Sequence, residues 1–143
     1  MAIKTTFPRA TCVTASQFQG FVRHYLIAAL WTETDEDDEN FDSKGISPED
    51  LPDETLSKAM ADCAQFVEQN DTLLKLAFGR YPPRGDSTPV ELAAHDFWLT
   101  RNGHGVGFWD RGIGVVGDRL SEACRAFRSV DLYRGDDNLI YLG

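Results

Sequence analysis

The sequence contains little of what builds a disulfide framework, a metal site or a membrane span. Its three cysteines, Cys12, Cys63 and Cys124, are odd in number and far apart, unlike a disulfide framework or the paired spacing of a zinc site. No apolar run approaches the roughly 18 residues that a membrane span needs, and the N-terminus lacks the pattern of a secretory signal. We therefore expect a protein of a reducing cytosol, without a membrane anchor, a bound metal or a cofactor.

Basic residues are also scarce, but the resulting acidity is local. The formal net charge is −9, and residues 33–54 hold eleven acids and one base, so the remainder is close to neutral. A block of like charge repels itself and usually stays solvated. We expect a mobile acidic loop at about 33–47, which lacks the Gly and Glu spacing of a calcium-binding EF-hand. Its candidate partner-binding residues are Asp35, Glu36, Asp37 and Asp38.

The chain has the length of one ordinary domain, so residues 1–143 are expected to form a single domain. Apolar residues at three-and-four spacing predict helices over about 16–31, 53–69, 71–78 and 118–127. Hairpins are predicted at about 95–111 and 130–142, where Asn102-Gly103 and Gly135 to Asn138 supply turn residues. The order predicts an α+β fold, with about three N-terminal helices, then hairpin, helix, hairpin, and helices packed on a small, mostly antiparallel sheet.

The segment from His95 to Gly112 holds two of the three histidines and two of the three tryptophans. If it is a hairpin, side chains alternate between its faces. One face carries an apolar middle, and the other carries Asp96, Trp98, Trp109 and Arg111 with two glycines. That second face is either structural, with Trp covering Gly and an Asp96–Arg111 ion pair, or a surface that binds a partner through its aromatic rings.

Acid–base chemistry is possible on the other hairpin face. His95 and Asp110 share one end of it, where a carboxylate can orient an imidazole, which is half of a general-base site. His104 at the tip is the third candidate catalytic residue. No nucleophile motif accompanies them, and a buried histidine satisfied by a carboxylate is the alternative.

The stretch from His95 to Arg111, together with Asp131 to Asp137, resembles small accessory proteins of tailed bacteriophages. The resemblance implies a phage protein that acts in the cytoplasm of its bacterial host. It carries over no catalytic residue and no reaction.

Three functions follow as hypotheses. The first is a non-enzymatic accessory protein that binds a host protein or defence component through the aromatic-glycine hairpin and the acidic segment. The second is an enzyme that acts on nucleic acid or a nucleotide with His95, His104 and Asp110. The third is a binder of single-stranded nucleic acid that stacks bases on Trp98 and Trp109.

Overall fold

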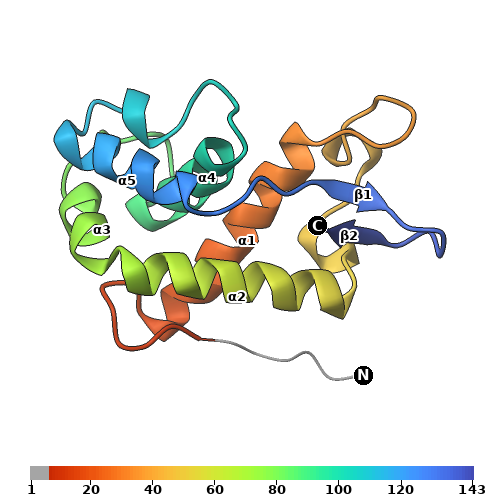
Figure 1. Ribbon diagram of the computed structural model, residues 1–143, viewed down its shortest axis with the longest axis horizontal. Helices are drawn as coiled ribbons and strands as arrows, with labels where there is room; N and C mark the ends of the chain where they lie inside the picture. Colours follow the sequence, from red (N-terminus) through yellow and green to blue (C-terminus); the bar gives the residue numbers. More distant parts are fainter. Residues whose placement is uncertain (1–6) are drawn as a thin grey trace.

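The computed structural model describes residues 7–143. The helices are α1 (Ala15–Thr32), α2 (Asp53–Gln69), α3 (Asp71–Phe78), α4 (Pro89–Arg101) and α5 (Val115–Arg125), with short 3-10 helices η1 (Asp42–Lys44), η2 (Pro48–Asp50) and η3 (Phe108–Asp110). Strands β1 (Leu132–Arg134) and β2 (Ile140–Leu142) form an antiparallel pair. Helices α1 and α2 cross and span the molecule, with α3, α4 and α5 gathered at one end and the hairpin at the other (Figure 1). The predicted α+β class is confirmed.

The small sheet packs on α2. Leu132, Ile140 and Leu142 are buried, while Thr55 Oγ1 of α2 donates to the Ile140 carbonyl at 2.7 Å and Lys58 Nζ to the Leu142 carbonyl at 2.9 Å. These bonds satisfy carbonyl groups of β2 that the two-stranded sheet leaves unpaired. The predicted C-terminal hairpin and the three predicted N-terminal helices are confirmed.

The core is an aromatic cluster centred on Phe97 of α4. Its ring stacks on Phe66 of α2 with a centroid separation of 4.0 Å. The ring of Tyr25 on α1 and that of Phe127, just after α5, both lie 5.1 Å away. Rings from two helices and the segment after α5 thus enclose one side chain, and α4 is held in place by its neighbours.

The hairpin predicted at 95–111 is wrong, because its first half is helix α4. Thr88 Oγ1 accepts from the Glu91 N–H at 3.2 Å, and the Glu91 carboxylate accepts from the Thr88 N–H at 2.8 Å. This capping box, with Pro89 at the first helical position, starts a helix at Pro89. Buried positions then lie on several sides of α4, so the sequence shows no regular polar face.

Asn102-Gly103 ends α4 instead of turning a hairpin. Gly103 has φ +68°, its N–H donates to the Thr100 carbonyl at 3.3 Å, and the His104 N–H donates to the Leu99 carbonyl at 3.0 Å. This pair of bonds is the Schellman motif, in which a left-handed glycine closes a helix. The same dipeptide that favours a tight hairpin turn therefore serves here as a helix cap.

The second half of the predicted hairpin folds back onto the end of α4. The Phe108 N–H donates to Thr100 Oγ1 at 3.2 Å, and Phe108 is fully buried. A Cβ atom at Gly107 would lie 2.0 Å from Thr100 Oγ1, so only glycine allows this close approach. The loop carries Trp109, Asp110 and Arg111 across the surface beside α4.

Within residues 7–143, no helix combines the length and the apolar character that crossing a bilayer requires.

Candidate functional site

The predicted binding face of Asp96, Trp98, Trp109 and Arg111 does not form. Trp98 is fully buried and donates from Nε1 to Thr32 Oγ1 at 2.8 Å, and Asp96 is also fully buried. Trp109 remains half exposed. Strand parity placed these residues on one face, but a helical period followed by a loop separates them.

The predicted ion pair between Asp96 and Arg111 is present, although it joins a helix to a loop. Arg111 Nη2 lies 2.7 Å from Asp96 Oδ1, and the Tyr81 hydroxyl donates to Asp96 Oδ2 at 2.7 Å. Burial raises the pKa of Asp96, and the hydrogen bonds from Arg111 and Tyr81 oppose this change. This ion pair holds the Arg111 side chain in one orientation.

In the acidic segment, Asp35 is not available to a partner. Its side chain is buried, with Lys44 Nζ at 2.8 Å and Arg134 Nη2 at 2.6 Å. The hydrogen bond from Arg134 is the main reason that the pKa of Asp35 lies well below its usual range. The contact ties the segment to the C-terminal hairpin.

Other acidic side chains of the segment point outward. Glu36, Asp37 and Asp38 are exposed, although Asp37 also pairs with Lys44 at 2.6 Å. A backbone bridge between Thr34 and Asn40 closes the segment. The mobility expected of residues 33–47 stays a prediction.

The predicted pairing of His95 with Asp110 is wrong, and another histidine takes the place of the carboxylate. His95 Nε2 lies 3.0 Å from His24 Nδ1 on α1, and His24 Nε2 lies 2.7 Å from Glu91 Oε2 on α4. Asp110 instead accepts from the Gly107 N–H at 2.9 Å and caps η3. We call the chain of groups from Glu91 through His24 to His95 the histidine relay.

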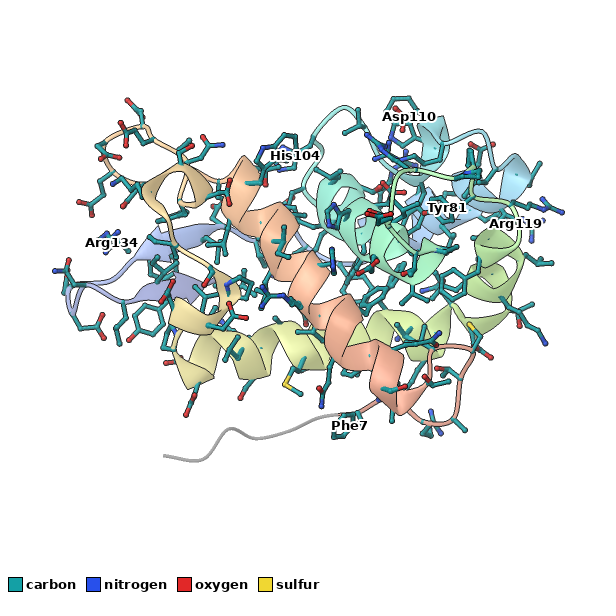
Figure 2. All side chains as sticks on the ribbon, turned by 180° about the vertical axis from the view of Figure 1, so that it is seen from behind. Phe7, Tyr81, His104, Asp110, Arg119 and Arg134 are labelled. Atoms are coloured by element: carbon teal, nitrogen blue, oxygen red, sulfur yellow. The ribbon has the colours of Figure 1, made fainter. Side chains whose placement is uncertain are left out.

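His104 does not join the relay. Its side chain, labelled in Figure 2, lines a hollow with Trp31, Asn40 and Val106, and its Nε2 atom is buried without a hydrogen-bond partner within residues 7–143. The three predicted catalytic residues therefore have three different settings: the relay, a helix cap and a turn.

His95 faces a cavity of about 450 Å³, here called the central cavity. It is lined by the polar residues Arg84, Ser87, His95 and Arg111 and the apolar residues Trp31, Leu92, Leu99 and Val106. A smaller hollow of about 230 Å³, lined by Tyr81 and Asp110 among others, shares the walls Arg84, Leu92 and Arg111 with it. The two hollows adjoin across the same arginines.

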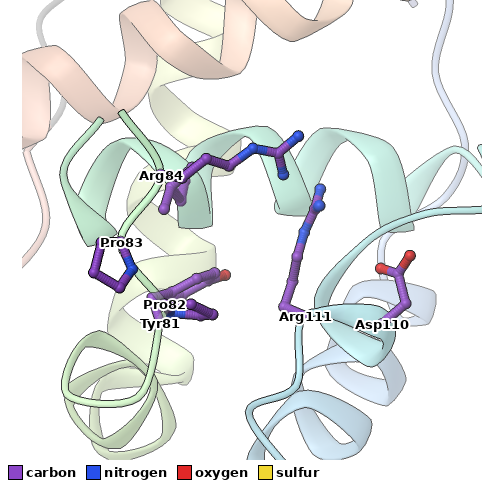
Figure 3. A pocket seen from close by; sticks show the side chains of 7 residues that line it. Tyr81, Pro82, Pro83, Arg84, Asp110 and Arg111 are labelled. Carbon is purple, nitrogen blue, oxygen red and sulfur yellow. The ribbon is translucent and has the colours of Figure 1, made fainter. Parts of the chain in front are cut away.

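The two arginines line both hollows and converge there. Figure 3 shows the side chains of Arg84 and Arg111 pointing toward one another, with Asp110 on the far side of Arg111. Arg84 is exposed and forms no ion pair within residues 7–143. It projects from a turn that the Ser87 N–H closes on the Arg84 carbonyl at 3.2 Å, with Gly85 at φ +59°. Asp96 already balances the charge of Arg111, so the charge of Arg84 is the one that a bound anion would balance.

The electrostatics keep His95 uncharged. Burial lowers its pKa to about 4, with smaller contributions from His24 when that ring is protonated and from the charge of Arg111, against the ordinary value of about 6.5. Each of these effects disfavours the imidazolium form. At neutral pH the cavity therefore presents a neutral imidazole beside two guanidinium groups.

We expect His95 to titrate near pH 4 in an NMR titration of the histidine ring signals. Between about pH 6.5 and 4 the unfolded chain binds a proton here that the folded chain does not, so stability falls as the pH falls through this window. In a His95→Gln variant this part of the pH dependence is lost. A His95 signal that titrates near 6.5 in the folded protein would contradict the buried relay.

Sequence reasoning missed four residues of this arrangement: His24, Trp31, Arg84 and Glu91. The Thr88-x-x-Glu91 capping box was a readable signal for α4. The pairing of His24 with His95 had none, since it depends on how α1 packs on α4.

Within residues 7–143, no group of three or more His, Cys, Asp or Glu side chains is placed to hold a metal ion. Comparison with protein-family models, with curated proteins and with solved structures finds no match to this chain.

Proposed function

We propose that the central cavity binds a phosphate-bearing ligand of about nucleotide size. The observation that carries the proposal is the convergence of the Arg84 and Arg111 side chains (Figure 3), since both arginines line the central cavity together with His95. A guanidinium presents N–H groups in a planar fork that matches phosphate oxygens. Arg111 is oriented by Asp96, whereas Arg84 has no carboxylate partner within residues 7–143, so a phosphate would complete its bonding.

The size of the cavity and an indole at its rim favour a nucleotide. About 450 Å³ lies within the range of small-molecule sites. Trp31 lines the same cavity with its side chain 60% exposed, which leaves an aromatic surface for a base to stack on. The net charge of −9 and the exposed carboxylates Glu36 to Asp38, close after Trp31 in the chain, disfavour a long nucleic-acid strand.

A different surface supports the second candidate, binding to a host protein in the bacterial cytoplasm. The predicted hairpin face is absent, because Asp96 and Trp98 are buried. Glu36, Asp37 and Asp38 remain exposed, on a segment that Asp35 anchors through Lys44 and Arg134. These carboxylates would meet basic residues of a partner. This candidate rests on the resemblance to phage accessory proteins together with that exposure.

Calorimetric titration with the four ribonucleoside monophosphates, the matching nucleosides and inorganic phosphate tests the proposal. We expect a monophosphate to bind and its nucleoside to bind much more weakly. Arg84→Gln removes charge-assisted hydrogen bonds worth about 1.5–3 kcal/mol, which corresponds to about 10- to 100-fold in affinity. Arg84 is exposed, so the variant should fold normally.

Arg119→Gln is the matched control, because Arg119 is an exposed arginine of α5 that does not line the central cavity. We expect it to bind as the wild type does. The proposal would be overturned if neither phosphate nor any of the four nucleotides bound to the protein. It would also be overturned if Arg84→Gln bound them as tightly as the wild type does.

A further inference from the structure

The histidine relay determines which nitrogen of His95 carries hydrogen. The Thr88 N–H that donates to Glu91 is the main reason that the pKa of Glu91 lies below its usual range, so this carboxylate is an acceptor only. His24 Nε2, 2.7 Å away, must then be the donor. When His24 is neutral, so that each imidazole carries one hydrogen, His24 Nδ1 accepts from His95 Nε2 across the 3.0 Å contact. His95 Nδ1 is left with a free lone pair.

This free nitrogen is accessible from the central cavity. Within residues 7–143 no group forms a hydrogen bond with His95 Nδ1, and it is not among the buried atoms that lack a partner. Since His95 lines the cavity, solvent and ligand reach the ring there. The charged or titratable groups that act on His95 are His24 from α1, Glu91 from α4, and Arg84 and Arg111 from the loops.

We propose that His95 Nδ1 is a nucleophile that accepts a phosphoryl group from a phosphoanhydride or acyl phosphate held by Arg84 and Arg111. This inference rests on the proposed function, because the two arginines must first bind the phosphate. Covalent catalysis by histidine requires an unprotonated nitrogen beside the reacting group. The guanidinium groups would stabilise the negative charge on the transferring oxygens.

The phosphoryl transfer needs only these residues and the phosphoryl donor. The Nδ1 lone pair attacks phosphorus, an N–P bond forms, and the P–O bond to the leaving group breaks. The leaving oxygen takes that electron pair, as the carboxylate of an acyl phosphate or the terminal phosphate of a nucleoside diphosphate. The hydrogen on His95 Nε2 moves to His24 Nδ1, and the resulting imidazolium lies against Glu91.

The cysteines and the serine of the central cavity are poorly placed to act as nucleophiles. Cys63 and Cys124 are buried, and burial raises the pKa of Cys63 well above the ordinary thiol value. The pKa of Cys12 is raised to about 12, chiefly by burial. Ser87 lines the central cavity but forms no side-chain hydrogen bond with a base within residues 7–143. His95 is the nucleophile that the relay prepares.

Incubation of the full chain with acetyl phosphate, and separately with ATP, tests the inference by intact mass spectrometry and peptide mapping. We expect one phosphoryl group on His95, stable in alkali and lost in acid, as the N–P bond of phosphohistidine is. His95→Gln should abolish it. His24→Gln should slow labelling by about 100-fold, because the proton acceptor is lost, and should change the pH profile of the rate. Arg119→Gln should label as the wild type does.

Parallel phosphate titrations separate this inference from the proposed function. Wild-type protein that binds phosphate but gains no label on His95 would overturn the nucleophile and leave the binding site standing. Protein that neither binds nor becomes labelled would overturn both. The inference would also be overturned by a label that maps to His24, His104 or a hydroxyl group. Equal labelling of His95→Gln and the wild type would overturn it as well.

Discussion

Replacement of Phe97 by alanine should lower the free energy of unfolding by about 3–5 kcal/mol. The ring is fully buried and is shared by Phe66, Tyr25 and Phe127 from three other segments. Its loss leaves a cavity that these rings cannot all close, because each is held by its own helix or segment. The aromatic contacts add about 0.5–1.5 kcal/mol each beyond area burial.

Urea denaturation followed by circular dichroism measures the effect. Leu76→Ala is the matched control: its side chain on α3 is 47% exposed, and its removal should change stability by less than about 1 kcal/mol. A Phe97→Ala variant that loses no more than Leu76→Ala would mean that α4 is not packed at the centre of the core.

Replacement of Asp62 by alanine should cost about 3 kcal/mol, because it leaves a buried guanidinium without its carboxylate. The Arg101 side chain is 5% exposed, and its Nη1 lies 2.6 Å from Asp62 Oδ2. Arg101 also donates to the Tyr25 hydroxyl at 3.0 Å and the Arg128 carbonyl at 2.7 Å, but neither acceptor carries a full charge. Arginine stays protonated in proteins, so it cannot avoid the penalty by losing its proton.

The same denaturation series checks this prediction, with Glu122→Ala as the control for loss of an acidic residue. Glu122 is exposed on α5 and forms no ion pair within residues 7–143, so its removal should stay within about 0.5 kcal/mol. A loss below about 1 kcal/mol in Asp62→Ala would show that solvent replaces the carboxylate at the exposed edge of the pair.

Local signals predicted most of the helices but not α4. Helices α1, α2 and α3 have apolar residues at three-and-four spacing in the sequence. Residues typical of helix ends lie near their termini. In α4, buried side chains lie on several sides, Asp96 among them, so neither helical nor strand periodicity is clear. The Thr88–Glu91 capping box was the better signal, and Asn102-Gly103 fits a hairpin turn and a helix cap equally well.

The candidate site, like the helices, was predicted only in part. Strand alternation in the predicted hairpin placed Asp96 and Arg111 on one face, and their ion pair is present although the hairpin itself is wrong. The partner of His95 was predicted wrongly, because His24 lies 71 positions away in the sequence and meets it only where α1 packs on α4. Convergence of Arg84 on Arg111 depends on two loops whose course no local pattern specifies.

The most direct test of the phosphate site is an NMR titration of histidine-labelled protein with inorganic phosphate. We predict a saturable shift of the His95 ring signals and a rise in the His95 pKa from about 4, because a bound anion favours the imidazolium. His104 signals should move little, and Arg84→Gln should weaken the response. Unchanged His95 signals and an unchanged His95 pKa at saturating phosphate would contradict a phosphate site formed by Arg84, Arg111 and His95.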